Sequence, residues 1–166
     1  EREVMSKIFD GKLKRVGGVR HSEYSEYLER KKHGDFVVKG GVFTDSERAF
    51  YSKLELVTER FPLRPLVKVA LKDIFDIKDS FLNHNQIHLE RLKNYYIDFL
   101  VCDEETMIPL LAIFLGKHNL DEMKFIEGLF EEFEINIAHV EEKEEYNVIE
   151  LIQIMELNID MKSLIK

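Results

Sequence analysis

The sequence predicts a small α/β domain with a mixed sheet flanked by helices, and three observations support this class. Short apolar segments rich in β-branched and aromatic residues alternate with segments whose apolar residues recur every three or four positions. Thr44 and Asn119 are each followed three positions later by Glu, a pattern typical of helix starts. The 166 residues are 45% hydrophobic, which suffices for one packed core.

Residues 1–43 differ in composition from the rest of the chain. Six of the eight glycines lie in residues 11–41, and residues 1–43 contain ten Lys/Arg and seven Asp/Glu. We therefore expect a basic, glycine-rich N-terminal arm over residues 1–43, with one short helix at Tyr24–Arg30, and the α/β domain over residues 44–166. The arm residues that could bind nucleic acid are Lys12, Lys14, Arg15 and Arg20. A solvated tail is the simpler interpretation of this charge.

A helix is expected directly after Thr44. Glu47 completes the capping box, and Pro62 and Pro65 end the helix. Four apolar residues at spacings of four, three and four form its buried face: Phe50, Leu54, Val57 and Phe61.

Three strands are expected next, at Leu66–Ala70, Tyr95–Cys102 and Ile108–Leu115. The third is almost wholly apolar, which is typical of a strand covered on both faces. Between the first two strands we expect a short helical turn at Lys72–Ile77 and a loop at Ser80–Glu90.

The C-terminal part continues with a helix, a strand and a last helix. Asn119 and Glu122 begin a helix whose apolar face is Met123, Ile126, Phe130 and Phe133. The strand is expected at Ile135–Val140, followed by a solvated acidic turn at Glu141–Glu145. Asn147 begins the last helix. A hairpin followed by a crossover helix gives a mixed sheet.

Asp98 is the charged residue whose position is most unusual, because its strand neighbours are apolar or aromatic. If it is buried, it requires a paired charge, hydrogen bonds or a cation, and hard oxygen ligands suit a divalent metal. Alternatively, Asp98 lies on the solvent face of an alternating strand. From the spacing alone we favour the solvent face.

Four segments in order carry a resemblance to a known superfamily: Phe43–Leu54, Val69–Asp73, Ile97–Asp103 and Pro109–Gly116. They resemble a bacterial family of uncharacterised domains placed in the PD-(D/E)XK nucleases, which have the restriction-endonuclease-like fold. The resemblance covers roughly residues 43–140. It implies a core of helix, three strands, helix and strand. It also implies a site that cuts phosphodiesters with an aspartate, a second acid and usually a lysine around magnesium.

The sequence departs from this pattern where the chemistry matters most. Phe114 stands at the position of the second acid, and Gly116 stands where the family has another acid and the superfamily commonly a lysine. Neither side chain can bind Mg²⁺, and Asp98 alone would be a poor site for an ion that prefers octahedral oxygen ligands. The resemblance therefore implies a degenerate centre in which Asp98 is vestigial and no metal or cofactor is bound.

Other residues could rebuild the site, although each has a simpler structural explanation. Glu47 could supply an acid, but the capping box explains it. Asp121, Glu122 or Lys124 could contribute from the following helix, but acids are ordinary at a helix N-terminus. Lys117 is next to the expected lysine position, but adjacent residues of a strand point to opposite faces.

The histidines and the cysteine carry no strong signal. His84 and His88 have a near-helical spacing, but a solvated loop explains them better than a metal site. His118 and His139 are isolated in the sequence. The single cysteine, Cys102, excludes an intramolecular disulfide or a multi-cysteine zinc site, and its apolar strand is typical of a small buried residue.

Composition narrows the functional classes. No apolar run approaches the roughly 20 residues of a transmembrane helix, and no secretion signal is recognised, so we expect a cytoplasmic protein without membrane contact. Our first hypothesis is a noncatalytic nuclease-fold module that acts through a protein partner or self-association in a bacterial DNA-related system. The alternatives are an active Mg²⁺-dependent DNA nuclease with relocated acids, and a nucleic-acid-binding module that uses the basic arm.

Overall fold

The computed structural model describes residues 32–33, 36–37, 41–78 and 86–164. The chain divides into two units, Glu1–Val42 and Phe43–Lys166. In the first unit, β1 (Lys32–His33) and β2 (Phe36–Val37) form a small antiparallel hairpin that the sequence did not indicate. The expected helix at Tyr24–Arg30 lies outside the described residues. The basic candidates of the arm do as well: Lys12, Lys14, Arg15 and Arg20.

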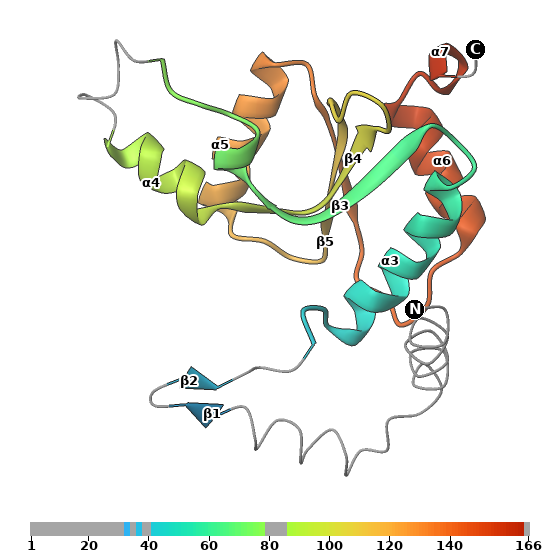
Figure 1. Cartoon of the computed structure of the whole chain (residues 1–166), viewed down its shortest axis with the longest axis horizontal. Coiled ribbons are helices and arrows are strands. Elements are labelled where there is room, and N and C mark those ends of the chain that lie inside the picture. The colour runs from blue at the N-terminus through green and yellow to red at the C-terminus, as the bar shows by residue number, and fades with distance from the viewer. Residues whose placement is uncertain (1–31, 34–35, 38–40, 79–85, 165–166) are drawn as a thin grey trace, which may run out of the picture. The chain divides into compact units, whose positions relative to one another are not determined.

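The second unit is built on an open four-stranded sheet with the order β3-β4-β5-β6 (Figure 1). Its strands are β3 (Leu63–Ala70), β4 (Tyr96–Asp103), β5 (Pro109–Leu115) and β6 (Asn136–Val140). β3, β4 and β5 pair antiparallel, whereas β5 and β6 pair parallel. The predicted mixed sheet is confirmed, and it follows from the hairpin between β4 and β5 and the crossover from β5 to β6.

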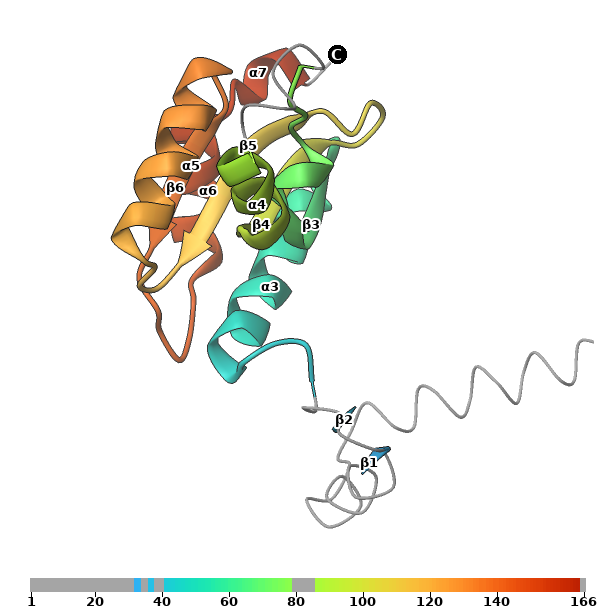
Figure 2. The same cartoon turned by 90° about the vertical axis from the view of Figure 1, so that its left-hand side faces the viewer.

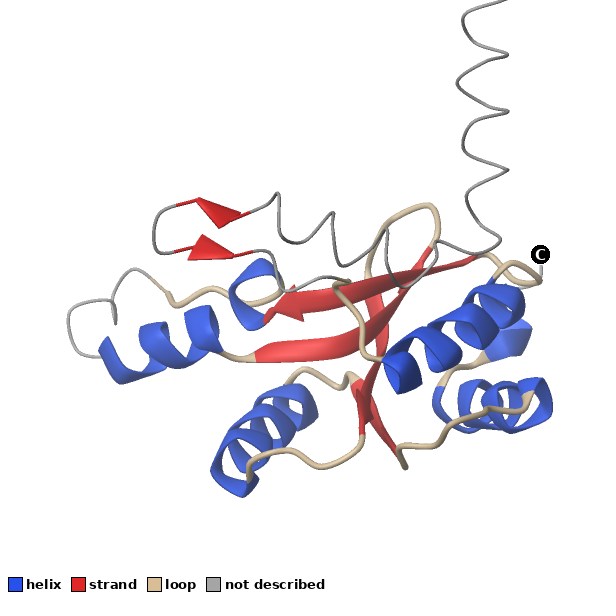
Figure 3. Cartoon of the chain, turned by 90° about the horizontal axis from the view of Figure 1, so that it is seen from below, coloured by secondary structure: helices blue, strands red, loops and turns tan. Residues whose placement is uncertain are grey.

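Helices cover both faces of this sheet (Figures 2 and 3). On one face, a core cluster joins the sheet to α3 (Asp45–Thr58), α6 (Val148–Asn158) and α7 (Met161–Leu164). On the other face, a second cluster joins it to η1 (Leu71–Asp73), α4 (Gln86–Asn94) and α5 (Leu120–Glu132). In the part of the chain that the structure describes, no helix has the length and apolar character needed to cross a membrane.

β5 lies at the centre of the packing, as its apolar sequence predicts. Leu111, Ile113 and Leu115 belong to the first core cluster, and Ala112 and Phe114 belong to the second. Successive residues of a strand point to opposite faces, so both faces of β5 are buried. The acidic turn at residues 141–145 is exposed, as expected.

Two boundaries differ from the predicted ones for a physical reason. α3 ends at Thr58, before either proline, and β3 extends back to Leu63 and contains Pro65. A proline cannot donate a backbone hydrogen bond, so it is tolerated in a strand mainly at a sheet edge. β3 is an edge strand of this sheet, which explains why Pro65 does not interrupt it.

The predicted loop at Ser80–Glu90 is wrong over its last residues, because α4 begins at Gln86. Leu92 is the buried residue of this short helix, so the helix buries little apolar surface. Two further tertiary contacts hold its C-terminal end. The Arg91 guanidinium lies over the Phe125 ring of α5, and the Leu71 backbone N–H donates to the Tyr95 carbonyl just after α4.

Candidate site around Asp98 and Lys68

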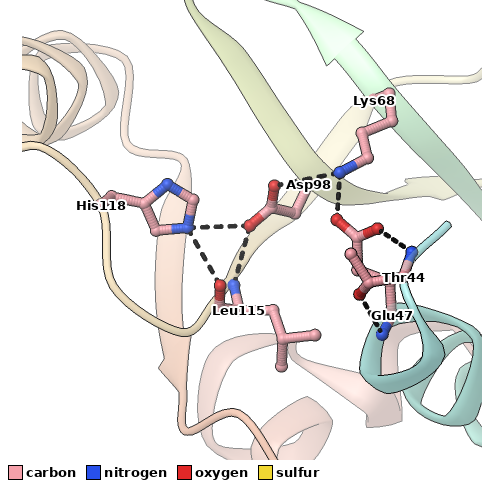
Figure 4. A network of polar contacts seen from close by, with 6 residues as sticks. All are labelled: Thr44, Glu47, Lys68, Asp98, Leu115 and His118. Atoms are coloured by element: carbon pink, nitrogen blue, oxygen red, sulfur yellow. Dashed lines mark hydrogen bonds and ion pairs between the residues drawn. The ribbon is translucent and has the colours of Figure 1, made fainter. Parts of the chain in front are cut away.

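Asp98 on β4 is buried, with 9% of its surface exposed, so the expectation of a solvent-facing side chain is wrong. Burial of a carboxylate requires strong partners. The Leu115 backbone N–H donates to Oδ2 at 2.9 Å, and His118 Nε2 lies 2.9 Å from the same oxygen (Figure 4). Oδ1 lies 3.8 Å from the Lys68 ammonium. Both carboxylate oxygens therefore have partners supplied by neighbouring elements.

Lys68 links Asp98 to the first helix of the domain. Its ammonium donates a hydrogen bond to Glu47 Oε1 and faces Asp98 Oδ1 across the strand pair (Figure 4). The Lys68 backbone has a φ of +51°, which is uncommon for a residue with a Cβ. The Lys68–Asp98 pair is also missing from the register between Val67–Phe99 and Val69–Ile97. The edge strand is thus irregular at the residue that carries the ammonium.

Glu47 has two roles, of which the sequence indicated one. The predicted capping box is confirmed: the Thr44 side chain accepts from the Glu47 backbone N–H, and Glu47 Oε2 accepts from the Thr44 backbone N–H at 2.8 Å. The other carboxylate oxygen binds Lys68. Burial alone would raise the pKa of Glu47, but the hydrogen bonds from Lys68 and Thr44 and the charge of Lys68 outweigh it and hold this pKa below its usual value.

His118, like Lys68, is a site residue that the sequence did not indicate. Its Nε2 lies 3.2 Å from the Leu115 carbonyl as well as near Asp98. Because both neighbours are acceptors, we infer that Nε2 carries the proton and donates. The ring packs edge-on against Phe114, with centroids 5.2 Å apart. The contact between His118 and Asp98 could have been predicted only if the register of β4 and β5 were known, because that register places the end of β5 beside Asp98.

Phe114 and Gly116 occupy the positions where the resemblance expects an acid and a second polar residue. The Phe114 ring is fully buried and packs between the rings of His118 and His139. Gly116 adopts a φ of +76°, and its backbone N–H donates to the Val140 carbonyl at 2.8 Å. Gly116 thus ends β5 with a turn that favours glycine. Neither residue brings an oxygen-bearing side chain to Asp98.

The structure does not bring the other sequence candidates to Asp98. The Glu122 backbone N–H donates to the Asn119 cap, which is the structural role expected of a helix N-terminus. Lys124 lines a groove between α5 and the segment after η1. Lys117 is exposed in the loop after β5.

The remaining histidines and the cysteine have structural surroundings. His88 stacks on Phe125, and His139 lies 3.0 Å from Glu127. His84 lies outside the described residues. Cys102 is buried as predicted, and burial, with a further contribution from the Asp103 charge, raises the pKa of its thiol to about 11. A thiol in this environment is not activated as a nucleophile.

The site therefore combines two carboxylates, one ammonium and one imidazole from four parts of the domain: Glu47 of α3, Lys68 of β3, Asp98 of β4 and His118 of the loop after β5. Opposite charges alternate along the chain of contacts, so each buried charge has a counter-charge or a donor. Within the described ranges, no group of three or more His, Cys, Asp or Glu side chains is arranged to hold a metal ion.

Fold and site together define an α/β domain with an internal carboxylate–lysine–carboxylate network. Residues 39–158 match the family described as "Protein of unknown function (DUF2726)". This match covers most of the 166 residues, and the chain belongs to that family. Neither a curated protein nor a solved structure matched the chain.

Proposed function

We propose that the domain is a restriction-endonuclease-like module whose nuclease centre has degenerated, and that it acts as a noncatalytic interaction or regulatory component of a bacterial DNA-related system. The order of elements in residues 44–140 supports the fold: a helix, three antiparallel strands, a helix and a parallel strand, with η1 and α4 inserted. The four sequence segments that resemble the PD-(D/E)XK nucleases lie on α3, at the end of β3, on β4 and on β5.

The observation that carries the proposal is the position of the Lys68 ammonium between Glu47 and Asp98. Metal-dependent hydrolysis needs carboxylates that bind a cation and leave coordination positions open for water and phosphate. Here the counter-charge for both carboxylates is a side chain of the protein itself. An ammonium neutralises the acids but offers no coordination position to a nucleophilic water.

Phe114 supports the same conclusion. A nuclease of this type would place its second acid here, whereas the ring of Phe114 is buried against His118 and His139. Since an aromatic ring cannot replace an oxygen ligand of Mg²⁺, the site lacks the second strand carboxylate. Asp98 then has a structural role, because it accepts a hydrogen bond from the Leu115 backbone N–H and so joins the end of β5 to β4.

The test is a cleavage assay with the purified chain. Supercoiled plasmid and single-stranded DNA are incubated with Mg²⁺, Mn²⁺ or EDTA, and nicking is followed on gels. We expect no metal-dependent cleavage above the level of Asp98→Ala. Metal-dependent nicking that Asp98→Ala abolishes would overturn the noncatalytic function.

One observation favours an active nuclease as the second candidate. Glu47, Asp98 and Lys68 lie together, so two acids and a lysine are present even though they do not come from the expected positions. In that case Glu47 replaces the acid missing at Phe114. Cleavage would then be lost in Glu47→Gln as well as in Asp98→Ala, which separates a relocated site from a contaminating nuclease.

A further inference from the structure

A groove with a volume of about 920 Å³ lies on the α4–α5 side of the domain, away from Asp98. One wall is α5, including Phe125 and Leu129, and the other is the segment after η1, including Phe75 and Ile77. Phe133, at the end of α5, also borders the groove and is 56% exposed. Large exposed apolar side chains beside an apolar groove are typical of a protein interaction surface.

Gly128 lies in the middle of α5 and lines the same groove. Glycine weakens a helix interior relative to alanine, so its presence here needs a reason. The described residues supply no such reason, because outside the nearby backbone of α5 none of their atoms lies within 4 Å of a Cβ added at Gly128. A missing Cβ on an exposed helix surface allows a second backbone to approach closely.

Five of the six charged residues of α5 are acidic, and its one lysine, Lys124, lies opposite Glu132 about Gly128. Lys124 lies four residues before it and Glu132 four residues after it, and all three residues line the groove. Residues four apart lie on one side of a helix. Among the described residues, neither Lys124 nor Glu132 forms an ion pair. A second α5 helix, running antiparallel and crossing at Gly128, would place its Glu132 against Lys124 and its Lys124 against Glu132.

We propose that two copies of the chain associate through α5. The helices cross antiparallel at Gly128 on a two-fold axis, and Lys124 of each copy pairs with Glu132 of the other. Phe133 of each copy then lies toward the Phe125 end of the opposite groove. A two-fold interface must be complementary to itself, and the placement of Lys124 and Glu132 on either side of Gly128 meets this condition. The inference stands whether or not the Asp98 site is catalytic.

Association is measured on the full chain by sedimentation equilibrium over a wide concentration range at low and moderate salt. We expect a monomer–dimer equilibrium. Lys124→Glu and Glu132→Lys each create like-charge contacts at two symmetric positions, and we expect each to raise the dissociation constant about tenfold or more. The double variant Lys124→Glu/Glu132→Lys restores both pairs with reversed polarity and should return the dissociation constant close to its original value.

Two further variants control the interpretation. Lys117→Glu changes the net charge as Lys124→Glu does, but on an exposed loop, and should leave the dissociation constant unchanged. Gly128→Trp fills the surface where the helices cross, and its Cβ has no close neighbour among the described residues outside α5, so it should abolish dimers while circular dichroism stays native. A chain that is monomeric at all concentrations would overturn the proposal. Dimers that resist both charge reversals, or that the double variant fails to restore, would overturn it equally.

Discussion

At the scale of single residues, the central feature of this protein is that the Lys68 ammonium is the counter-charge of two carboxylates at once. Glu47 and Asp98 belong to different elements, and both lie within reach of the same ammonium. If these three side chains were fully exposed, their contacts would contribute little to stability. Because they are partly buried, the contacts stabilise the fold: a buried carboxylate that loses its partner still carries the cost of its desolvation.

Replacing Lys68 by Met tests this role. Met retains much of the apolar stem but leaves Glu47 and Asp98 facing each other without the ammonium. We expect the free energy of unfolding at pH 7 to fall by about 1–2 kcal/mol, a value reduced for the partial exposure of Lys68. Urea denaturation measures it. Lys117→Met, at an exposed lysine, is the matched control and should change stability by less than about 0.5 kcal/mol.

The loss of stability caused by Lys68→Met should depend on pH in a defined direction. Because the pKa of Glu47 is held below its ordinary value of 4.5 in the folded chain, this group stabilises the fold above that value. Its contribution is lost as the pH falls through the folded pKa. Lys68→Met removes a main cause of the lowered pKa. The stability difference between wild type and variant should therefore shrink between pH 5 and strongly acidic pH, as urea titrations at several pH values would reveal. A difference that grows on acidification would contradict it.

Asp98→Asn separates structural from catalytic use of the carboxylate. Asn can still accept from the Leu115 N–H through its carbonyl, but it loses the charge that faces Lys68 and the second acceptor oxygen. We expect unfolding free energy to fall by about 1–3 kcal/mol with no change in DNA cleavage. Asp98→Ala, which leaves the Leu115 N–H without its acceptor, should be less stable than Asp98→Asn. Equal stability of the two variants would argue against the hydrogen bond.

At the scale of elements, the two glycines of residues 43–166 have opposite roles. Gly116 needs its positive φ to end β5 and to donate to the Val140 carbonyl, whereas Gly128 lies in a regular helix with open space at its Cβ position. The backbone conformation therefore decides the effect of adding the same methyl group to each.

Alanine substitutions compare the two positions directly. Gly116→Ala should lower the free energy of unfolding by about 1–2 kcal/mol, because it forces a left-handed conformation on a residue with a Cβ. The new Cβ also lies only 3.2 Å from Glu142 Oε2. Gly128→Ala should raise the stability of the monomer by up to about 1 kcal/mol through helix propensity. Both are measured by denaturation at low protein concentration. A stabilised Gly116→Ala would show that the turn does not depend on glycine.

At the scale of the whole molecule, the reactivity of Cys102 reports whether the central strands stay closed. Its thiol is buried on β4, and its pKa is raised to about 11. At pH 8 roughly one thiol in a thousand is then ionised, and the thiolate is the reactive form. We expect negligible labelling by a thiol reagent under native conditions and complete labelling in urea, followed by mass spectrometry. Rapid native labelling would indicate that β4 opens locally.

The sequence by itself determined the fold class, the order of the main elements and the helix caps at Thr44 and Asn119. These features depend on residues close in the chain: apolar residues repeat with the period of a helix or strand, and caps act over one turn. The candidate Asp98 could be named for the same reason, because its unusual neighbours are adjacent to it. That Phe114 and Gly116 differ from the nuclease pattern is an expectation that depends on the resemblance alone.

Only the tertiary structure decided how Asp98 is satisfied. The burial of Asp98, its contact with His118 and the position of Lys68 depend on strand register and on the irregular backbone at Lys68. These bring together residues that no local pattern connects. α4 is a second example, since contacts with α5 stabilise a short helix that has one buried residue, Leu92. Local propensity acts within a few residues, whereas a buried charge is stabilised by whichever donors the folded chain places around it.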